Sequence, residues 1–255
     1  MSAVHLTLRD GVAELRLDNP AKLNALTVEM LAAIDRHCDT VEGDGSVRAL
    51  VLGAEGTRAF CTGADIGEWA ALPPVDFVRN WVRRGHRAFD RLARLPVPTV
   101  AAIGGPAFGG GLELAACCDI RVLSPGAMLA LPEASVGIVP GWSGTQRLLR
   151  LLPEAAVKEM ALFGRRLSAD RALALGFAAQ VADDPLAAAR EIAAAAAELS
   201  PRAAETAKYM IHAAAGEDRA AMTEALGSGM MAASGDRSEG IAAFRDKRKA
   251  RFAGS

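Results

Sequence analysis

Two glutamates, Glu113 and Glu133, are the residues of this sequence best suited by type and setting to acid/base chemistry. Both lie in apolar stretches, LELAA and LALPEAS. Burial and a neighbouring like charge raise carboxyl pKa values and separate them, so one carboxyl can act as a general base and the other as a general acid. We therefore treat both as candidate catalytic residues. Either could instead be ordinary, Glu113 as a favourable first-turn acid of a helix and Glu133 as a surface loop residue.

Two turns of small residues follow predicted strands, a position in which backbone N–H groups can bind a ligand. The run GGPAFGGG (104–111) follows an apolar strand-like segment and leads directly into the helical pattern that contains Glu113. Gly63 and Ala64 form a similar turn after the buried strand-like segment RALVLG (48–53). Glycine lets the backbone approach a ligand closely, and a helix N-terminus presents unpaired N–H groups. Such turns can bind phosphate or stabilise an oxygen that gains charge during a reaction.

The elements around these turns predict a repeated arrangement. Val4 to Arg9 and Val12 to Asp18 alternate apolar and polar residues across Asp10-Gly11, which indicates a β-hairpin. The order of strand, tight turn and helix then occurs twice before Glu113, with helical patterns after Thr27 and from Val75 to Leu95. This layout favours repeated β-β-α units over a single nucleotide-binding sheet.

The C-terminal part of the sequence has a different pattern. Phe177 to Val181 is the last segment that reads as a strand, and helical patterns follow Asp184. They include a helix that begins at Pro201, one from Glu217 to Ala233 and one from Glu239 to Phe252. The sequence therefore predicts a helical packing or assembly module after the main domain.

Composition excludes several classes of protein. The 255 residues include 29 basic and 30 acidic side chains, so no overall field attracts nucleic acid or a membrane surface. The four cysteines lack zinc-site spacing and fit a reducing compartment. Signal-peptide and membrane-spanning patterns are absent, so we expect a cytoplasmic protein without a metal. The histidines, including His86, have no partner motif and receive no catalytic role.

Five strings of residues resemble the crotonase (enoyl-CoA hydratase/isomerase) superfamily. They are FCTGADI (60–66), FGGGLEL (108–114), CDI (118–120), LPE (131–133) and PGWSGTQRL (140–148). Each is weak alone, but together they occur in order at fitting spacing, and the resemblance extends from Ala3 to Phe252. It implies an α/β fold, a spiral of repeated β-β-α units over residues 1–199. Residues 200–255 would then form an α-helical trimerisation region, giving a homotrimer or a dimer of trimers.

The resemblance also implies an activity. The substrate would be an acyl-CoA thioester, with coenzyme A as part of the substrate and no separate cofactor. Backbone N–H groups of Ala64 and Gly110 would form the oxyanion hole, where each donor is worth about 3 to 4 kcal/mol. Family hydratases use two glutamates to add one water across a 2-enoyl double bond. Glu113 would help to activate the water, and Glu133 would supply the proton to the α-carbon.

Further residues correspond to the CoA site of the family. They are Lys22, Leu23, Asn24, Ala25, Ala64, Asp65, Ile66, Gly67 and Gly110, with Phe244 and Lys247 contributed by a neighbouring subunit. Gly67 departs from a frequent lysine, and Trp142-Ser143 from small residues that are often glycine. The second departure is expected to reshape the acyl pocket. Trp69, Trp81 and Phe89 are candidates for lining that pocket or for ordinary packing.

Other functions fit the residues less well. A serine hydrolase would need glycine at position 145 after Ser143, where Thr145 stands. A phosphotransferase loop would need Lys and Ser or Thr after the glycines, where Leu112 and Glu113 stand. A non-catalytic RNA-binding relative is disfavoured by the near-neutral charge. Within the superfamily, isomerase, hydrolase and decarboxylase reactions stay open as alternatives to hydration.

Overall fold

A computed structural model describes residues 2–217 and 219–255 of the chain. It divides the chain into two compact units, Met1–Pro201 and Arg202–Ser255. In the described part of the chain, no helix combines the length and the apolar character needed to cross a membrane. The expected roles of the two parts, catalysis for 1–199 and assembly for 200–255, remain predictions.

The first unit contains two sheets. The strands are β1 (Ala3–Arg9), β2 (Val12–Asp18), β3 (Ala49–Ala54), β4 (Thr99–Ile103), β5 (Ala107–Phe108), β6 (Ile120–Leu123), β7 (Met128–Ala130), β8 (Leu167–Ser168) and β9 (Gln180–Val181). The larger sheet has the order β1-β2-β3-β4-β6-β9, and the smaller one the order β5-β7-β8. β1 and β2 form the expected antiparallel hairpin, and the rest of the larger sheet is parallel.

Helices connect the strands and follow them. The α-helices of the first unit are α1 (Val28–Gly43), α2 (Ile66–Trp69), α3 (Pro74–Asp76), α4 (Arg83–Ala93), α5 (Gly110–Ala115), α6 (Gly144–Leu151), α7 (Glu154–Phe163), α8 (Ala169–Ala174) and α9 (Pro185–Ala197). Short 3₁₀ helices cover Pro20–Lys22 and Glu133–Val136, and a π-helical stretch covers Phe77–Val82. This mixture of strands and helices confirms the predicted α/β class.

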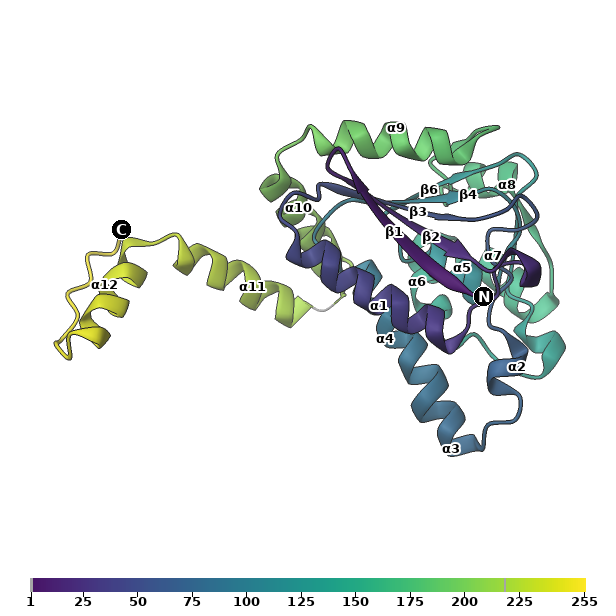
Figure 1. Cartoon of the computed structure of the whole chain (residues 1–255), viewed down its shortest axis with the longest axis horizontal. Coiled ribbons are helices and arrows are strands. Elements are labelled where there is room, and N and C mark those ends of the chain that lie inside the picture. The colour runs from purple at the N-terminus through teal and green to yellow at the C-terminus, as the bar shows by residue number, and fades with distance from the viewer. Residues whose placement is uncertain (1, 218) are drawn as a thin grey trace. The chain divides into compact units, whose positions relative to one another are not determined.

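Helices cover both faces of the larger sheet (Figure 1). On one face, Ala189 and Ala193 of α9 pack on small and branched residues such as Val51 and Val100. On the other face, Leu15 and Leu52 contribute to the main core, which also contains buried residues of α1 and α4. The buried strands of a parallel sheet are apolar on both sides, as in the LVL run of β3.

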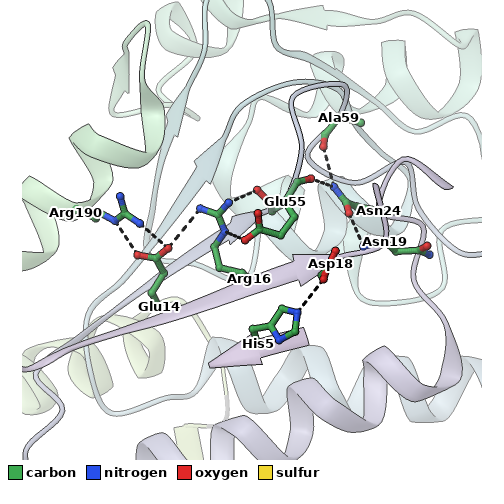
Figure 2. A network of polar contacts seen from close by, with 10 residues as sticks. His5, Glu14, Arg16, Asp18, Asn19, Asn24, Glu55, Ala59 and Arg190 are labelled. Carbon is green, nitrogen blue, oxygen red and sulfur yellow. Dashed lines mark hydrogen bonds and ion pairs between the residues drawn. The ribbon is translucent and has the colours of Figure 1, made fainter. Parts of the chain in front are cut away.

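Polar contacts hold the outer strands and the loop after β2 in place (Figure 2). Arg190 of α9 reaches Glu14 of β2 through two hydrogen bonds of 2.8 Å. The buried Asn24 side chain donates to the carbonyl oxygens of Glu55 and Ala59 at 2.9 and 3.1 Å. It also accepts from the Asn19 N–H at 2.9 Å. These bonds fix the loop that runs beside the Gly63–Ala64 turn.

Some segments differ from their predicted form. The helix expected from Val75 to Leu95 is built from α3, the π-helical stretch and α4. The strand expected at 177–181 is limited to Gln180–Val181, because the N–H groups of Phe177 and Ala178 donate to the Ala172 carbonyl oxygen of α8 instead of to a neighbouring strand.

The second unit is helical, as the sequence predicted. It contains most of α10 (Pro201–Ala214), together with α11 (Arg219–Ala232) and α12 (Gly235–Arg245). The helix predicted for 217–233 is observed as α11, while position 218 lies outside the described residues. The helix predicted for 239–252 ends at Arg245, since Lys247 adopts a left-handed conformation with φ 53°.

Candidate active site

The two small-residue turns lie against each other. Strand-like bridges join Leu26 to Ala64 and Cys61 to Ala107, and the Phe108 N–H donates to the Cys61 carbonyl oxygen at 2.9 Å. A Cβ atom on Gly111 would lie 2.1 Å from that oxygen, so only glycine allows this approach. Among the described residues, neither the Ala64 N–H nor the Gly110 N–H donates a hydrogen bond to another backbone group. Two free donors therefore face the same region.

The Glu113 carboxylate is buried on the first turn of α5 and is held by a second segment. Its Oε1 accepts hydrogen bonds from the N–H of Trp142 at 2.8 Å and of Gly144 at 2.7 Å. Burial raises the pKa of Glu113, while these two N–H donors and the charge of Arg147 oppose that rise. The hydrogen bonds fix one oxygen of the carboxylate in place.

Glu133 lies at the start of a 3₁₀ helix, where the structure buries it. Burial raises its pKa to about 7, and the negative charge of Glu113 adds to the rise. Its Oε2 is buried without a hydrogen-bond partner among the described residues. A Cβ on Gly109 would lie 2.8 Å from Oε1, so the glycine turn makes room for this carboxyl. An unpaired buried oxygen of this kind is suited to bind a ligand.

A cavity of about 650 Å³ unites these groups. Ala64, Gly110, Glu113 and Glu133 all line it. The rest of its wall is largely apolar and includes Ile66, Trp69, Phe77, Trp81, Val82, Val136, Ile138, Val139 and Trp142. The arrangement offers two N–H donors and two carboxyl groups to a ligand with an apolar tail.

Trp142 fills the space behind these groups. Its ring contacts Trp81 and Phe89 with centroid separations of 5.1 and 5.2 Å. A Cβ on Gly85 would lie 2.2 Å from the indole Nε1, and one on Gly110 would lie 2.7 Å from its Cζ3. The tryptophan therefore fits only because both neighbours are glycines. Trp69 and Trp81 line the cavity as considered from the sequence, whereas Phe89 is a fully buried packing residue.

The predicted CoA-binding residues fall into three groups. Ile66 lines the cavity, together with Ala64 and Gly110. Lys22, Leu23, Asn24, Ala25, Asp65 and Gly67 are not among the described residues that line it, although the Leu23 carbonyl oxygen accepts the Thr62 N–H just before the Gly63–Ala64 turn, at 3.1 Å. Phe244 and Lys247 belong to the second unit.

Several of the predicted CoA-binding residues are tied together by short polar contacts. Lys22 Nζ forms an ion pair with Asp65 Oδ2 at 2.6 Å. Asp65 Oδ1 accepts from the Gly67 N–H at 3.0 Å and so caps α2. The bonded lysine lowers the pKa of Asp65. Lys22 remains largely exposed, and the Asn24 amide is committed to the loop itself.

A group of polar residues that the sequence did not predict to lie together is found near Glu113. Ser143 Oγ is 2.9 Å from His86 Nδ1, and His86 Nε2 is 3.3 Å from Asp90 Oδ2. Arg147 pairs with the same aspartate through Nη2. The spacing of His86 and Asp90, four residues apart on a helix, was the one available signal, and Ser143 is 57 residues away.

This trio does not have the arrangement of a serine hydrolase. In a hydrolytic triad the serine contacts the histidine Nε2 and the aspartate contacts Nδ1, the reverse of the stronger contacts here. Ser143 is also not among the described residues that line the cavity. This geometry agrees with the sequence argument against a serine hydrolase, in which Thr145 stands where a glycine is needed.

The cysteines pack as apolar side chains. Cys38, Cys61, Cys117 and Cys118 are buried thiols that are not joined in disulfides, and burial raises the pKa of Cys61 to about 12. Among the described residues, no group of three or more His, Cys, Asp or Glu side chains is arranged to hold a metal ion.

Comparisons with known proteins agree with this fold and cavity. The model of the family described as enoyl-CoA hydratase/isomerase matches residues 7–255. A short-chain-enoyl-CoA hydratase of Clostridium acetobutylicum is 34% identical and aligns over 98% of this chain and 97% of its own. The chain belongs to the enoyl-CoA hydratase/isomerase family, within the crotonase superfamily.

Solved structures extend the comparison to the fold. DspI of Pseudomonas aeruginosa has a TM-score of 0.82 and 32% identity, covering 98% of this chain and 96% of its own. An enoyl-CoA hydratase of Bacillus anthracis has a TM-score of 0.81 and 31% identity, covering 99% of each chain. The crotonase-type fold expected from the sequence motifs is confirmed.

Proposed function

We propose that this protein is an enoyl-CoA hydratase that adds water across the 2,3 double bond of a 2-enoyl-CoA thioester. The observation that carries the proposal is the placement of two buried glutamates and two free backbone N–H groups around one apolar cavity. Membership of the family supports an acyl-CoA substrate. The apolar wall favours an acyl group of matching character.

The geometry supports a division of roles. The Ala64 and Gly110 N–H groups would bind the thioester oxygen and stabilise the negative charge that it gains. Glu113, with one oxygen fixed by two N–H donors, would orient a water molecule and accept its proton as the oxygen attacks the β-carbon. Glu133 would donate a proton to the α-carbon. Hydroxyl and proton together account for the added water, so no separate cofactor is required.

The raised pKa of Glu133 supports its role as the acid. A carboxyl group with a pKa of about 7 is protonated in a large fraction of molecules near neutral pH. An ordinary glutamate would be almost fully ionised there and could not donate a proton. We further propose that Phe244 and Lys247, from a neighbouring subunit, bind the adenine and 3′-phosphate of CoA.

The test is incubation of the purified protein with short, medium and aromatic 2-enoyl-CoA thioesters. Loss of the conjugated-thioester absorbance and a mass gain of one water are the expected results. Glu113→Gln and Glu133→Gln should each lower the rate by orders of magnitude while the protein stays folded and binds a saturated acyl-CoA. CoA release, loss of carbon dioxide or an unchanged mass would assign the protein to another reaction of the superfamily.

A further inference from the structure

Ser143 occupies an unusual position in front of α6. It is the residue at which the helix begins, where a serine hydroxyl commonly accepts a backbone N–H of the first turn. Here no such side-chain cap is formed, and the backbone has φ 75°, a left-handed conformation that L residues rarely adopt. The hydroxyl instead contacts both ring nitrogens of His86, Nδ1 at 2.9 Å and Nε2 at 3.4 Å. The side chain therefore contacts α4 rather than its own helix.

The residues on either side of Ser143 are those that hold Glu113. Trp142 and Gly144 donate their N–H groups to the same carboxylate oxygen, at 2.8 and 2.7 Å. Both donors belong to one turn, and their direction depends on the backbone conformation at Ser143. A contact that restrains the backbone of Ser143 therefore also keeps both N–H groups directed at Glu113.

His86 is itself anchored. Asp90, one turn later on α4, lies 3.3 Å from His86 Nε2 and also pairs with Arg147 of α6. Arg147 is buried, and its backbone N–H donates to the Ser143 carbonyl oxygen at 2.9 Å. The contacts connect α4 to α6 twice, through His86 with Ser143 and through Asp90 with Arg147. Two such connections restrict the movement of α6 relative to α4.

We propose that the His86–Ser143 hydrogen bond is a positioning contact that keeps the Trp142 and Gly144 N–H groups aligned on Glu113. His86 and Ser143 touch no substrate in this proposal and act only through the turn. Its catalytic consequence rests on the proposed hydratase function, because Glu113 is the residue being positioned. Small displacements of a catalytic group lower turnover more than they lower binding.

Matched variants separate this role from simple packing. Ser143→Gly removes the hydroxyl and keeps a residue that adopts the left-handed backbone readily. His86→Ala removes the other partner, and His86→Asn keeps a hydrogen-bonding atom near the position of Nδ1. His5→Ala is the control, because His5 contacts Asp18 on β2 at 2.9 Å (Figure 2) and neither residue is among the described residues that line the cavity.

We expect Ser143→Gly and His86→Ala to lower kcat about tenfold with KM little changed. The double variant should be no worse than either single variant. His86→Asn should restore most of kcat. In hydrogen-exchange mass spectrometry, the segment containing Trp142 and Gly144 should exchange about tenfold faster in the two damaging variants.

Unchanged exchange in that segment with both His86→Ala and Ser143→Gly would overturn the proposal, whatever the reaction. Additive losses in the double variant, or no recovery of kcat with His86→Asn, would also contradict it. If the wild-type protein adds no water to any thioester, the hydratase proposal fails separately. The exchange measurement then still decides whether the hydrogen bond positions the turn.

Discussion

At the scale of single residues, the surroundings of Glu133 differ from those of Glu113. Glu113 accepts two backbone hydrogen bonds, whereas a buried oxygen of Glu133 has no partner among the described residues. Hydrogen bonds to a carboxylate favour its charged form, and burial without them favours the neutral form. The two environments therefore support opposite roles for the same residue type, base for Glu113 and acid for Glu133.

This contrast predicts the pH dependence of hydration. Because Glu133 must carry a proton to donate it, kcat/KM should fall as the pH rises through about 7. The measurement is kcat/KM from pH 5.5 to 9, with circular dichroism confirming that the fold persists. A rate that stays constant or rises across pH 7 would remove Glu133 as the proton donor.

The same pKa has a consequence for stability that is independent of activity. The folded-state pKa of Glu133 is raised above its ordinary value of 4.5, so the folded state binds this proton more tightly than the unfolded chain does. The stabilisation is complete below pH 4.5 and is lost as the pH rises through about 7. The free energy of unfolding, measured with urea, should decrease over this pH range in the wild-type protein. The decrease should be smaller in Glu133→Gln, which lacks the titrating group.

At the scale of elements, the first turn of α6 packs directly on the side chain of Glu113. A Cβ atom on Gly144 would lie 2.6 Å from Glu113 Cγ and 2.7 Å from Oε1. The glycine therefore lets the start of α6 approach α5 closely enough to donate its N–H. The close packing of these helix starts determines where the carboxylate points.

Gly144→Ala should displace the Glu113 side chain by several tenths of an ångström and lower kcat by about 10- to 100-fold. Gly126→Ala is the matched control, because a Cβ there meets nothing within 4 Å and its backbone φ is not positive. Steady-state kinetics and the thermal unfolding midpoint of both variants provide the measurement. A Gly144→Ala protein with wild-type kcat would show that the carboxylate position is not critical.

At the scale of the whole molecule, the second unit exposes many large apolar side chains. Phe244 is 86% exposed and Met230 is 76% exposed. Met210, Ile211, Met231, Ile241 and Phe252 are also exposed. Contiguous apolar surface on a soluble protein commonly marks an interface. These residues support the expectation that the C-terminal region assembles copies of the chain.

Sedimentation of the full chain should therefore give a trimer or a dimer of trimers. A chain ending at Ser200 should sediment as a smaller species and bind acyl-CoA more weakly, because the predicted contacts of Phe244 and Lys247 are removed. Both proteins should be compared at the same concentration, with circular dichroism to verify folding. A well-folded monomer for the full chain would contradict the assembly prediction.

The sequence by itself determined the local parts of this site. The Gly63–Ala64 and Gly109–Gly111 turns could be predicted because glycine, which has no Cβ atom, allows positive φ angles and close backbone approach that other residues disfavour. The β1–β2 hairpin followed from its two-residue periodicity, and the buried strand β3 from its continuous apolar run. Membership of the family was readable from five short strings in order. The catalytic role of Glu113 and Glu133 is still a prediction, but both glutamates were identified from these local patterns.

Only the tertiary structure decided how these parts meet. The N–H groups that hold Glu113 belong to residues 29 and 31 positions later in the chain, and His86 lies 57 positions before Ser143. Sequence periodicity encodes backbone conformation and burial, but contacts between distant segments arise from packing of the whole core. The missing Cβ atoms of Gly85 and Gly110, which admit the Trp142 ring, acquire meaning only when the segments that carry them are in contact.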